Sequence, residues 1–220
     1  MIMAAKHLQT IAGWGNFPGA ESYIFSPGNT EIWKSLIRQK DFIARGLGRS
    51  YGDQATNQNK NVGICTPMHC FLAWDEAAGI LGCEAGARLE EIITYFAPRG
   101  WLAMICPGTI GGAIANDIHG KAHHADGSFI NCVVSFSILL ADGSIVTASG
   151  TEHPDLFMAN FGGLGLLGVI LTAKIRLRKI ETTYFKQKSV KVNNLEEMLE
   201  AVEKYQGYNY SVAWIDPLPK

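Results

Sequence analysis

The sequence predicts an α+β fold, because signals for hairpin strands and for isolated helices are mixed along the chain. The apolar runs 133–140 and 144–148 flank Asp142-Gly143, a pair that favours a hairpin turn because both residues tolerate positive φ. Apolar side chains recur at helical spacing in residues 89–96 and again in 195–202, as in amphipathic helices. No regular strand–helix–strand repeat connects these elements, so a mixed domain is favoured over a parallel array.

The first half of the chain predicts two helices among short strands. A helix is expected over 31–40, where Ile32 and Leu36 share a face, with Thr30 as its N-terminal cap. The helix at 89–96 should end near Pro98 and Gly100. The other elements expected in this half are strands at 42–45, 62–65 and 80–85 and a polar loop at 57–61.

The second half follows the predicted hairpin with two helices and two strands. A short helix should begin at Pro154, because proline suits the first helical position. The run 169–177 alternates apolar and polar residues toward its end, as a half-buried strand does. A helix is expected over 196–205 with Asn194 as a cap, followed by a strand-like run at 208–214. Because that last run has no later partner in the sequence, we expect residues 1–180 to form one domain and 181–220 to begin a second, truncated lobe.

Composition and charge narrow the classes of function. The chain has 220 residues, of which 47% are hydrophobic and 18% charged, as in a globular protein. Its formal net charge of −1 gives no electrostatic reason to expect a nucleic-acid partner. The sequence shows no apolar run of about 18 residues and no apolar leader, so we expect no transmembrane segment and a cytoplasmic location, with association at a membrane surface left open. Scattered cysteines favour reduced thiols over a disulfide framework: Cys65, Cys70, Cys83, Cys106 and Cys132.

The first glycine-rich stretch, residues 46–52, comes directly after the predicted strand 42–45. Glycine lets backbone amides approach a ligand closely, and amides turned the same way form anion-binding hollows. The spacing of Gly46, Gly48 and Gly52 differs from the dinucleotide-binding fingerprint, and no Gly-Lys-Ser/Thr ending marks a P-loop. A tight turn between strands is therefore an open alternative for this stretch on its own.

The second stretch, residues 107–121, joins a glycine pair and small residues to a polar cluster. Small side chains would bring the backbone against a flat ligand, and Asn116, Asp117, His119 and Lys121 could form hydrogen bonds with it. Histidines here also raise the hypothesis of a zinc site, but neighbouring His123-His124 would point apart and the cysteines lie at unrelated spacings, so no metal is expected.

Together these stretches resemble the FAD-binding domain, also called PCMH-type, of the vanillyl-alcohol-oxidase superfamily of flavoproteins. The resemblance rests on residues 44–53, on 111–121 and on His123-His124, and it continues through 13–15, 141–143, 161–168 and 210–214. It is strongest to bacterial oxidoreductases of the decaprenylphosphoryl-ribose oxidase type. It implies two α+β subdomains that hold FAD, followed by the start of a substrate lobe.

The resemblance also implies roles for particular residues. Residues 45–55 would wrap the FAD diphosphate, 108–112 would form a second wall, 116–119 would lie along the flavin, and Ile170 would pack near the adenine. The cofactor-binding residues implied in this way are Arg45, Gly46, Leu47, Gly48, Arg49, Ser50, Tyr51, Gly52, Gly108, Thr109, Gly111, Gly112, Asn116, Asp117, Ile118, His119 and Ile170. Candidates for catalysis near the flavin are Tyr51, His119 and Lys121, and Lys121 and Trp214 would border the substrate.

The implied chemistry is hydride transfer from a secondary alcohol to flavin N5. Many members of the superfamily attach flavin covalently to a histidine where this chain has Arg49; a guanidinium cannot form that bond, so FAD should be held non-covalently. The expected substrate is the 2′-hydroxyl of a polyprenyl-phosphate-linked ribose, a step of cell-wall biosynthesis, with a partner reductase as a further candidate. Two alternatives stay open: oxidation of an aldonolactone or 2-hydroxy acid, and a non-catalytic nucleotide-binding module.

Overall fold

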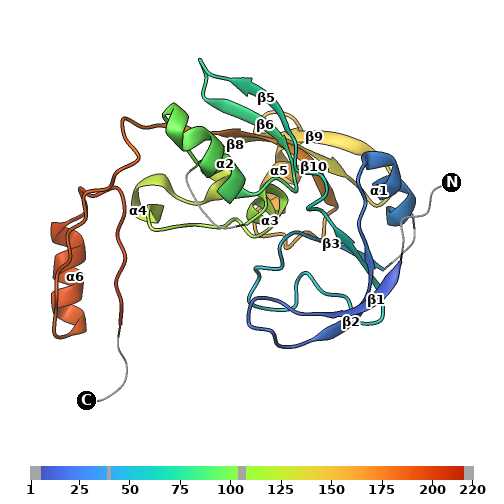
Figure 1. The fold of residues 1–220 in the computed structure, drawn as a ribbon, viewed down its shortest axis with the longest axis horizontal. Coiled ribbons are helices and arrows are strands. Elements are labelled where there is room, and N and C mark those ends of the chain that lie inside the picture. The colour runs from blue at the N-terminus through green and yellow to red at the C-terminus, as the bar shows by residue number, and fades with distance from the viewer. Residues whose placement is uncertain (1–5, 39–40, 104–107, 216–220) are drawn as a thin grey trace.

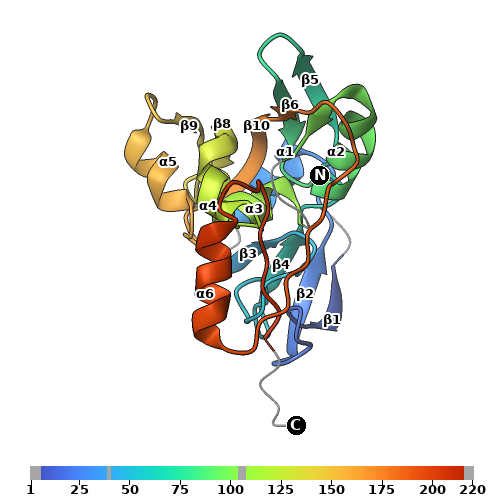
Figure 2. The same cartoon turned by 90° about the vertical axis from the view of Figure 1, so that its left-hand side faces the viewer.

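The computed structural model describes residues 6–38, 41–103 and 108–215 and builds the body of the molecule from two main sheets (Figure 1). The small sheet has the order β1 (His7–Ile11), β2 (Ala20–Phe25), β4 (Asn61–Ile64), β3 (Phe42–Arg45). The large sheet has the order β5 (Phe71–Asp75), β6 (Ile80–Glu84), β10 (Val169–Arg176), β8 (Val133–Leu139), β9 (Ile145–Ser149). Figure 2 shows the small sheet below the large one, so the predicted mixed α+β fold is confirmed.

The small sheet contains both strand directions. Strand β1 is antiparallel to β2, whereas β2 and β3 each run parallel to β4. Helix α1 (Thr30–Ile37) lies in the connection from β2 to β3, which flank β4 and run in the same direction, because parallel strands of one sheet need a crossover connection. The C-terminal ends of β3 and β4 therefore lie side by side, and the first glycine-rich stretch begins there.

Every neighbouring pair in the large sheet is antiparallel. The predicted hairpin is present as β8 and β9, but its turn differs from the two-residue turn expected. Gly143 alone has positive φ (+88°), and Leu140 N–H donates to the carbonyl of Ser144 at 2.9 Å. The Asp142 carboxylate accepts from the backbone N–H and the hydroxyl of Ser144, so it stabilises the turn from its side chain.

Helices pack on the large sheet and bury its main core. Helix α2 (Leu89–Phe96) buries Leu89, Ile92 and Phe96 there, as the helical spacing predicts. The other helices of the body are α3 (Ile110–Ala115), α4 (His123–Asp126) and α5 (Pro154–Asn160), with 3₁₀ turns at η1 (Ala97–Arg99) and η2 (Phe129–Cys132). A two-stranded ribbon is formed by β7 (Trp101–Leu102) and β11 (Arg178–Lys179). Pro154 is the first residue of α5, which confirms that prediction.

A second core cluster holds α1 against the large sheet. Trp33, which is 1% exposed, packs with Met68, Leu139, Val169 and Leu171. Since α1 also belongs to the crossover of the small sheet, this cluster fixes the two sheets relative to each other.

Two predicted details of α1 are wrong. The cap is Asn29, whose side chain accepts from Ile32 N–H at 3.0 Å, and Thr30 is already helical. Asn29 has the extended backbone that a capping residue needs, which a sequence pattern does not reveal. The helix ends at Ile37, short of the expected Lys40, and residues 39 and 40 lie outside the described part of the chain.

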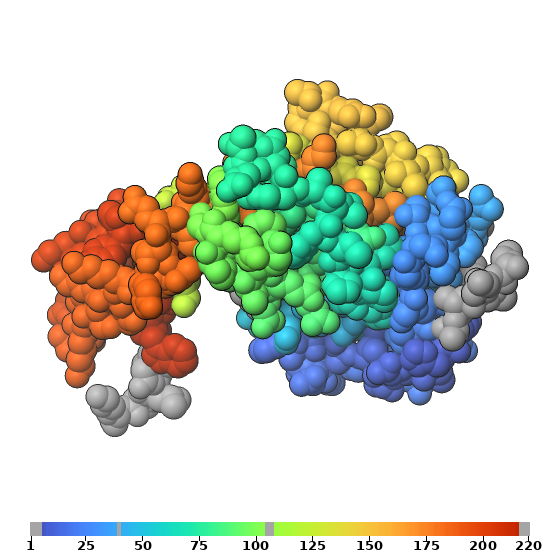
Figure 3. Space-filling view, turned by 45° about the horizontal axis from the view of Figure 1, so that its top comes forward, coloured from blue at the N-terminus to red at the C-terminus, as the bar shows by residue number. Residues whose placement is uncertain are grey.

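Beyond Ile180 the chain leaves the body (Figures 1 and 3). Helix α6 (Leu195–Lys204) forms there as predicted, with the Asn194 side chain accepting from Glu197 N–H at 2.9 Å. The expected strand at 208–214 is wrong: these residues join no sheet, and Ser211 N–H donates instead to the carbonyl of Lys121. A strand needs a neighbouring strand to pair with, and the described residues supply none here.

Candidate functional site

A cavity of about 310 Å³ lies between the stretch after β3, helix α3 and the turn before β10. Its described lining residues are Ala44, Gly46, Leu47, Gly48, Arg49, Ser50, Tyr51, Gln54, Ala55, Cys65, Gly108, Thr109, Gly111, Gly112, Ala113, Ala115, Asn116, Ile118, Leu164, Gly165, Gly168 and Ile170. A smaller cavity of about 120 Å³ shares Ala44, Gly165 and Gly168 with it. Two adjoining cavities suit an elongated ligand, and the larger has the volume of a small-molecule site.

The first glycine-rich stretch offers its backbone to this cavity. Within the described residues, no N–H of residues 46–52 donates a hydrogen bond to the chain. The stretch also lies against the second one: a Cβ on Gly46 would collide with the hydroxyl of Thr109. Glycine is therefore required for the two stretches to approach, and the free amides provide donors for an anion.

Most backbone N–H groups of the second stretch donate hydrogen bonds within the chain, so they are not available to a ligand as expected. The stretch contains the whole of α3, and its N–H groups are largely used within the chain: Ile110 donates to Ala87 O, Gly111 to Ala85 O, and Gly112 to the Thr109 hydroxyl. These bonds pin α3 to the large sheet through the segment after β6. This stretch therefore contributes a close, small-residue wall, whereas the free amides lie in the first stretch.

A third glycine-rich segment, residues 162–168, completes the cavity. Leu164 has φ of +56° and donates its N–H to Ala115 O, which ties this segment to the end of α3. A Cβ on Gly168 would crowd Leu139 O at 2.5 Å. The glycine cluster was visible in the sequence, but its place in the site was missed because only the tertiary fold brings it to α3.

The charge and polarity of the lining favour an anion. Arg49 is the one charged side chain among the described lining residues, and its guanidinium lies 4.7 Å from the ring centre of Trp14. Cys65 stays protonated, because burial raises its pKa to about 12. The buried Oε1 of Gln54 has no hydrogen-bond partner within the described residues, so a ligand group could satisfy it.

Most of the residues expected to bind a cofactor line the cavity, but four do not. Arg45 lies beneath the first stretch, where its guanidinium donates to Ala55 O and Ala12 O. Asp117 accepts from Ile130 N–H at 3.0 Å, so its carboxylate holds the 3₁₀ turn η2. Gly52 and His119 also fall outside the described lining. Gln54 also lines the cavity and lies within the range 45–55 expected to wrap the diphosphate, whereas the lining residues that were not expected include Cys65, Leu164, Gly165 and Gly168.

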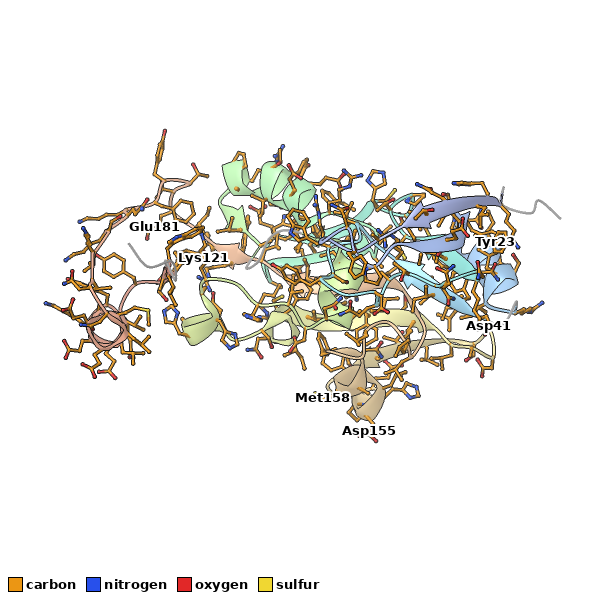
Figure 4. The ribbon with its side chains drawn as sticks, turned by 90° about the horizontal axis from the view of Figure 1, so that it is seen from below. Tyr23, Asp41, Lys121, Asp155, Met158 and Glu181 are labelled. Atoms are coloured by element: carbon orange, nitrogen blue, oxygen red, sulfur yellow. The ribbon has the colours of Figure 1, made fainter. Side chains whose placement is uncertain are left out.

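The proposed substrate residues lie outside the cavity. Lys121 is exposed, and Figure 4 places it at the end of the body from which the C-terminal segment departs, far from Tyr23 and Asp41. Trp214 is 94% exposed and Tyr51 is 83% exposed, although Tyr51 does border the cavity. His123 and His124 are exposed, but they lie in helix α4 and not in the loop that the sequence suggested. The described residues contain no group of metal-ligating side chains.

Sequence comparison identifies the family that shares this arrangement. Residues 29–149 match the family described as FAD binding domain. The chain is 34% identical over 96% of its length to decaprenylphosphoryl-beta-D-ribose oxidase of Mycolicibacterium smegmatis, of which it covers 48%. The chain belongs to the FAD-binding domain family. The resemblance to the vanillyl-alcohol-oxidase superfamily is thereby confirmed, and FAD is the cofactor.

Other relatives of this FAD-binding domain act on different compounds, according to their names. It is 31% identical over 78% of its length to D-arabinono-1,4-lactone oxidase of Yarrowia lipolytica, covering 35% of that protein. It is also 31% identical over 66% of its length to carbohydrate oxidase of Microdochium nivale, covering 30% of that protein. The chain thus spans about half or less of the length of these relatives.

The residues of the FAD-binding domain fit the cofactor. The diphosphate of FAD is an anion, and the first stretch presents free amides beside Arg49 without an acidic side chain in the described lining. The buried Oε1 of Gln54, which has no partner within the described chain, could accept a hydrogen bond from a hydroxyl or N–H group of the cofactor. None of the helices described is long and apolar enough to cross a membrane.

Proposed function

We propose that the protein oxidises a secondary alcohol with FAD, and that its substrate is the 2′-hydroxyl of a ribose carried on a polyprenyl phosphate. The observation that carries the proposal is the cavity where the free amides of residues 46–52 face the small-residue wall of α3. The choice of substrate is supported by the similarity to a decaprenylphosphoryl-ribose oxidase over 96% of the chain. The proposal includes a cytoplasmic enzyme that meets its lipid-linked substrate at a membrane surface and passes electrons to an acceptor such as a partner reductase.

In this proposal the chain binds and orients, while the cofactor performs the redox step. Bound FAD would supply the hydride acceptor, at flavin N5, for the alcohol carbon, and the hydroxyl proton would pass to a base. The amides of residues 46–52 and the Arg49 guanidinium would hold the diphosphate without covalent attachment. Gly111 and Gly112 would let the flat part of the ligand approach α3, and Ile170 would pack at the far end of the cavity.

The proton acceptor and the substrate contacts belong to the outer side of the site. Tyr51, His119 and Lys121 are candidates for catalysis, and Tyr51 is the one that borders the cavity. Lys121 and Trp214 would contact the substrate from the side where Ser211 N–H donates to Lys121 O. We propose residues 1–180 as the FAD-binding domain and 181–220 as the beginning of a substrate lobe, which is supported by the departure of the chain from the body beyond Ile180.

A second candidate function is oxidation of an aldonolactone or a 2-hydroxy acid. It is favoured by the similarity to the D-arabinono-1,4-lactone oxidase of Yarrowia lipolytica over 78% of the chain. A non-catalytic module that binds FAD is the third candidate, because the cavity by itself accounts for binding.

Reduction of bound flavin separates these candidates. The purified protein, loaded with FAD, is mixed anaerobically with a polyprenyl-phosphate ribose, with its 2′-deoxy analogue as control, or with an aldonolactone. Bleaching of the visible flavin absorbance by the ribose compound alone supports the first proposal. Bleaching by the lactone supports the second candidate, and bound flavin that no substrate bleaches supports the module.

A further inference from the structure

The side chain of Arg45 links the first glycine-rich stretch, residues 46–52, to neighbouring segments of the chain. Arg45, the last residue of β3, donates from Nη1 to the carbonyl of Ala55 at 2.9 Å and from Nη2 to the carbonyl of Ala12 at 2.7 Å. Trp14 N–H also donates to Ser50 O at 2.7 Å. One guanidinium thus joins the beginning of the stretch, the segment after it and the chain before β2.

Residues 46–52 pack closely around the guanidinium of Arg45. Gly48 has φ of +65°, and a Cβ at this position would collide with the Arg45 guanidinium. A guanidinium has donors in a rigid planar fork, so it can hold two carbonyls from different segments in one fixed geometry. Arg45 is half-buried and absent from the described lining of the cavity, whereas its neighbours Gly46, Leu47 and Gly48 line it.

Without these hydrogen bonds of Arg45, the binding of FAD would carry a cost in conformational entropy. A stretch with three glycines has many conformations when free, and ordering it on binding would cost conformational entropy. Its N–H groups make no hydrogen bond to the described chain that would order it directly. Fixing the two ends of the stretch in advance lowers the cost of ordering and thereby raises affinity.

We propose that Arg45 is a positioning residue, which holds residues 46–52 in the conformation that receives the FAD diphosphate without touching it. This inference rests on the proposed binding of FAD in the cavity. It differs from the role as a direct cofactor contact that the family resemblance implies for Arg45.

The test is FAD titration of the purified apoprotein, followed by fluorescence, for the unaltered protein, Arg45→Met, Arg45→Lys and the control Arg178→Met. Arg178 is also partly buried and pairs with Asp126, away from the cavity. We expect Arg45→Met to weaken FAD binding at least about tenfold and Arg45→Lys to weaken it less, because preorganisation is partly kept. Arg178→Met should bind FAD within about twofold of the unaltered protein.

Two further readouts separate positioning from direct contact and from general damage. If Arg45 acts by ordering the stretch and not by attracting the diphosphate, the weaker FAD binding of Arg45→Met should persist at about 500 mM salt, where charge attraction is largely screened. Hydrogen exchange should show that FAD protects residues 46–52 less in Arg45→Met than in the unaltered protein, with equal exchange in β8 and β10. A defect of Arg45→Met that is present at about 50 mM salt but vanishes at about 500 mM would overturn the inference in favour of direct charge contact.

The outcomes distinguish the two proposals. Failure of the unaltered protein to bind FAD contradicts the proposed function, whereas equal FAD affinity of Arg45→Met and the unaltered protein overturns the inference alone. If Arg45→Met does not fold, Arg45→Lys decides: unaltered affinity and unaltered protection of residues 46–52 would overturn the inference.

Discussion

Two adjacent glycines at this site, Gly111 and Gly112, differ in the direction in which a side chain would point. Both glycines line the cavity, but an added Cβ on Gly111 would point toward the protein, 3.2 Å from the Cβ of Ala85 and 3.4 Å from its carbonyl oxygen. Gly112 lines the cavity, and an added Cβ would meet within 4 Å only the Thr109 hydroxyl, at 3.1 Å. The sequence shows the pair but does not reveal which member faces the ligand.

This difference predicts opposite effects of the same substitution. Gly112→Leu should abolish FAD binding with little change in thermal stability, because its side chain has room only on the cavity side. Gly111→Leu should lower the free energy of unfolding by about 1–3 kcal/mol through overpacking against Ala85. FAD titration and thermal unfolding by circular dichroism measure both effects. Equal behaviour of the two variants would contradict the assignment of the two faces.

Arg49 predicts how the cofactor is retained. None of the described lining residues is a histidine, and Arg49, which cannot form a bond to flavin, packs on Trp14 at the cavity. We therefore expect acid precipitation of the FAD-loaded protein to leave the yellow colour in the supernatant, as measured by absorbance. Flavin that stays with the protein pellet would show a covalent bond and contradict this prediction.

At the scale of elements, the start of α1 depends on a residue outside the helix. The Asn29 side chain satisfies Ile32 N–H, whereas Thr30 makes no such bond. Asn29→Ala should lower the free energy of unfolding by about 1 kcal/mol, and the neighbouring control Thr30→Ala should change it by less than about 0.5 kcal/mol. Urea unfolding measures both variants, and a larger loss in Thr30→Ala would show that the cap is misassigned.

The glycine-rich beginning of α3 shows how an element's function depends on its neighbours. A helix start generally leaves its first N–H groups free for an anion. Here Ile110 and Gly111 donate to carbonyls at 87 and 85, so α3 is anchored to the sheet instead. The amides available to a ligand belong to the stretch after β3, which has no regular structure.

At the scale of the whole molecule, buried thiols couple stability to pH. Cys83 is 0% exposed and Cys132 is 3% exposed, and burial raises the pKa of each thiol from 9.0 to about 12. Above pH 9 the unfolded chain releases these protons while the folded protein keeps them, so stability falls as the pH rises toward 12. The loss should be roughly 1.4 kcal/mol per pH unit for each thiol.

Comparison with a variant isolates this contribution from other groups that titrate at high pH. The double variant Cys83→Ala/Cys132→Ala should lose stability less steeply than the unaltered protein between about pH 9 and pH 10, measured by urea unfolding. Below pH 8 the two should differ by a constant amount. Parallel curves throughout the range would show that burial does not hold these thiols protonated.

The sequence predicted elements well where the signal is local. The helical spacing of 89–96, Pro154 at the start of α5 and Asn194 before α6 are all confirmed. The strands β1, β2 and β5 were missed, and the strand expected at 208–214 is absent, because strand formation depends on pairing with another strand more than on composition. The two glycine-rich stretches were found as site segments from their composition, but the third was not.

The chain by itself determined the turns, the helical faces and the glycines that let the backbone approach a ligand, since these follow from each residue's own conformational limits. Only the tertiary structure decided that the amides of residues 46–52 donate to no group in the described part of the chain, that those of α3 are used, and that Arg45 faces Ala12 and Ala55 rather than the cavity. The physical reason is that a hydrogen-bonding group's partner is set by which distant segment lies beside it, and that depends on how the two sheets pack around Trp33.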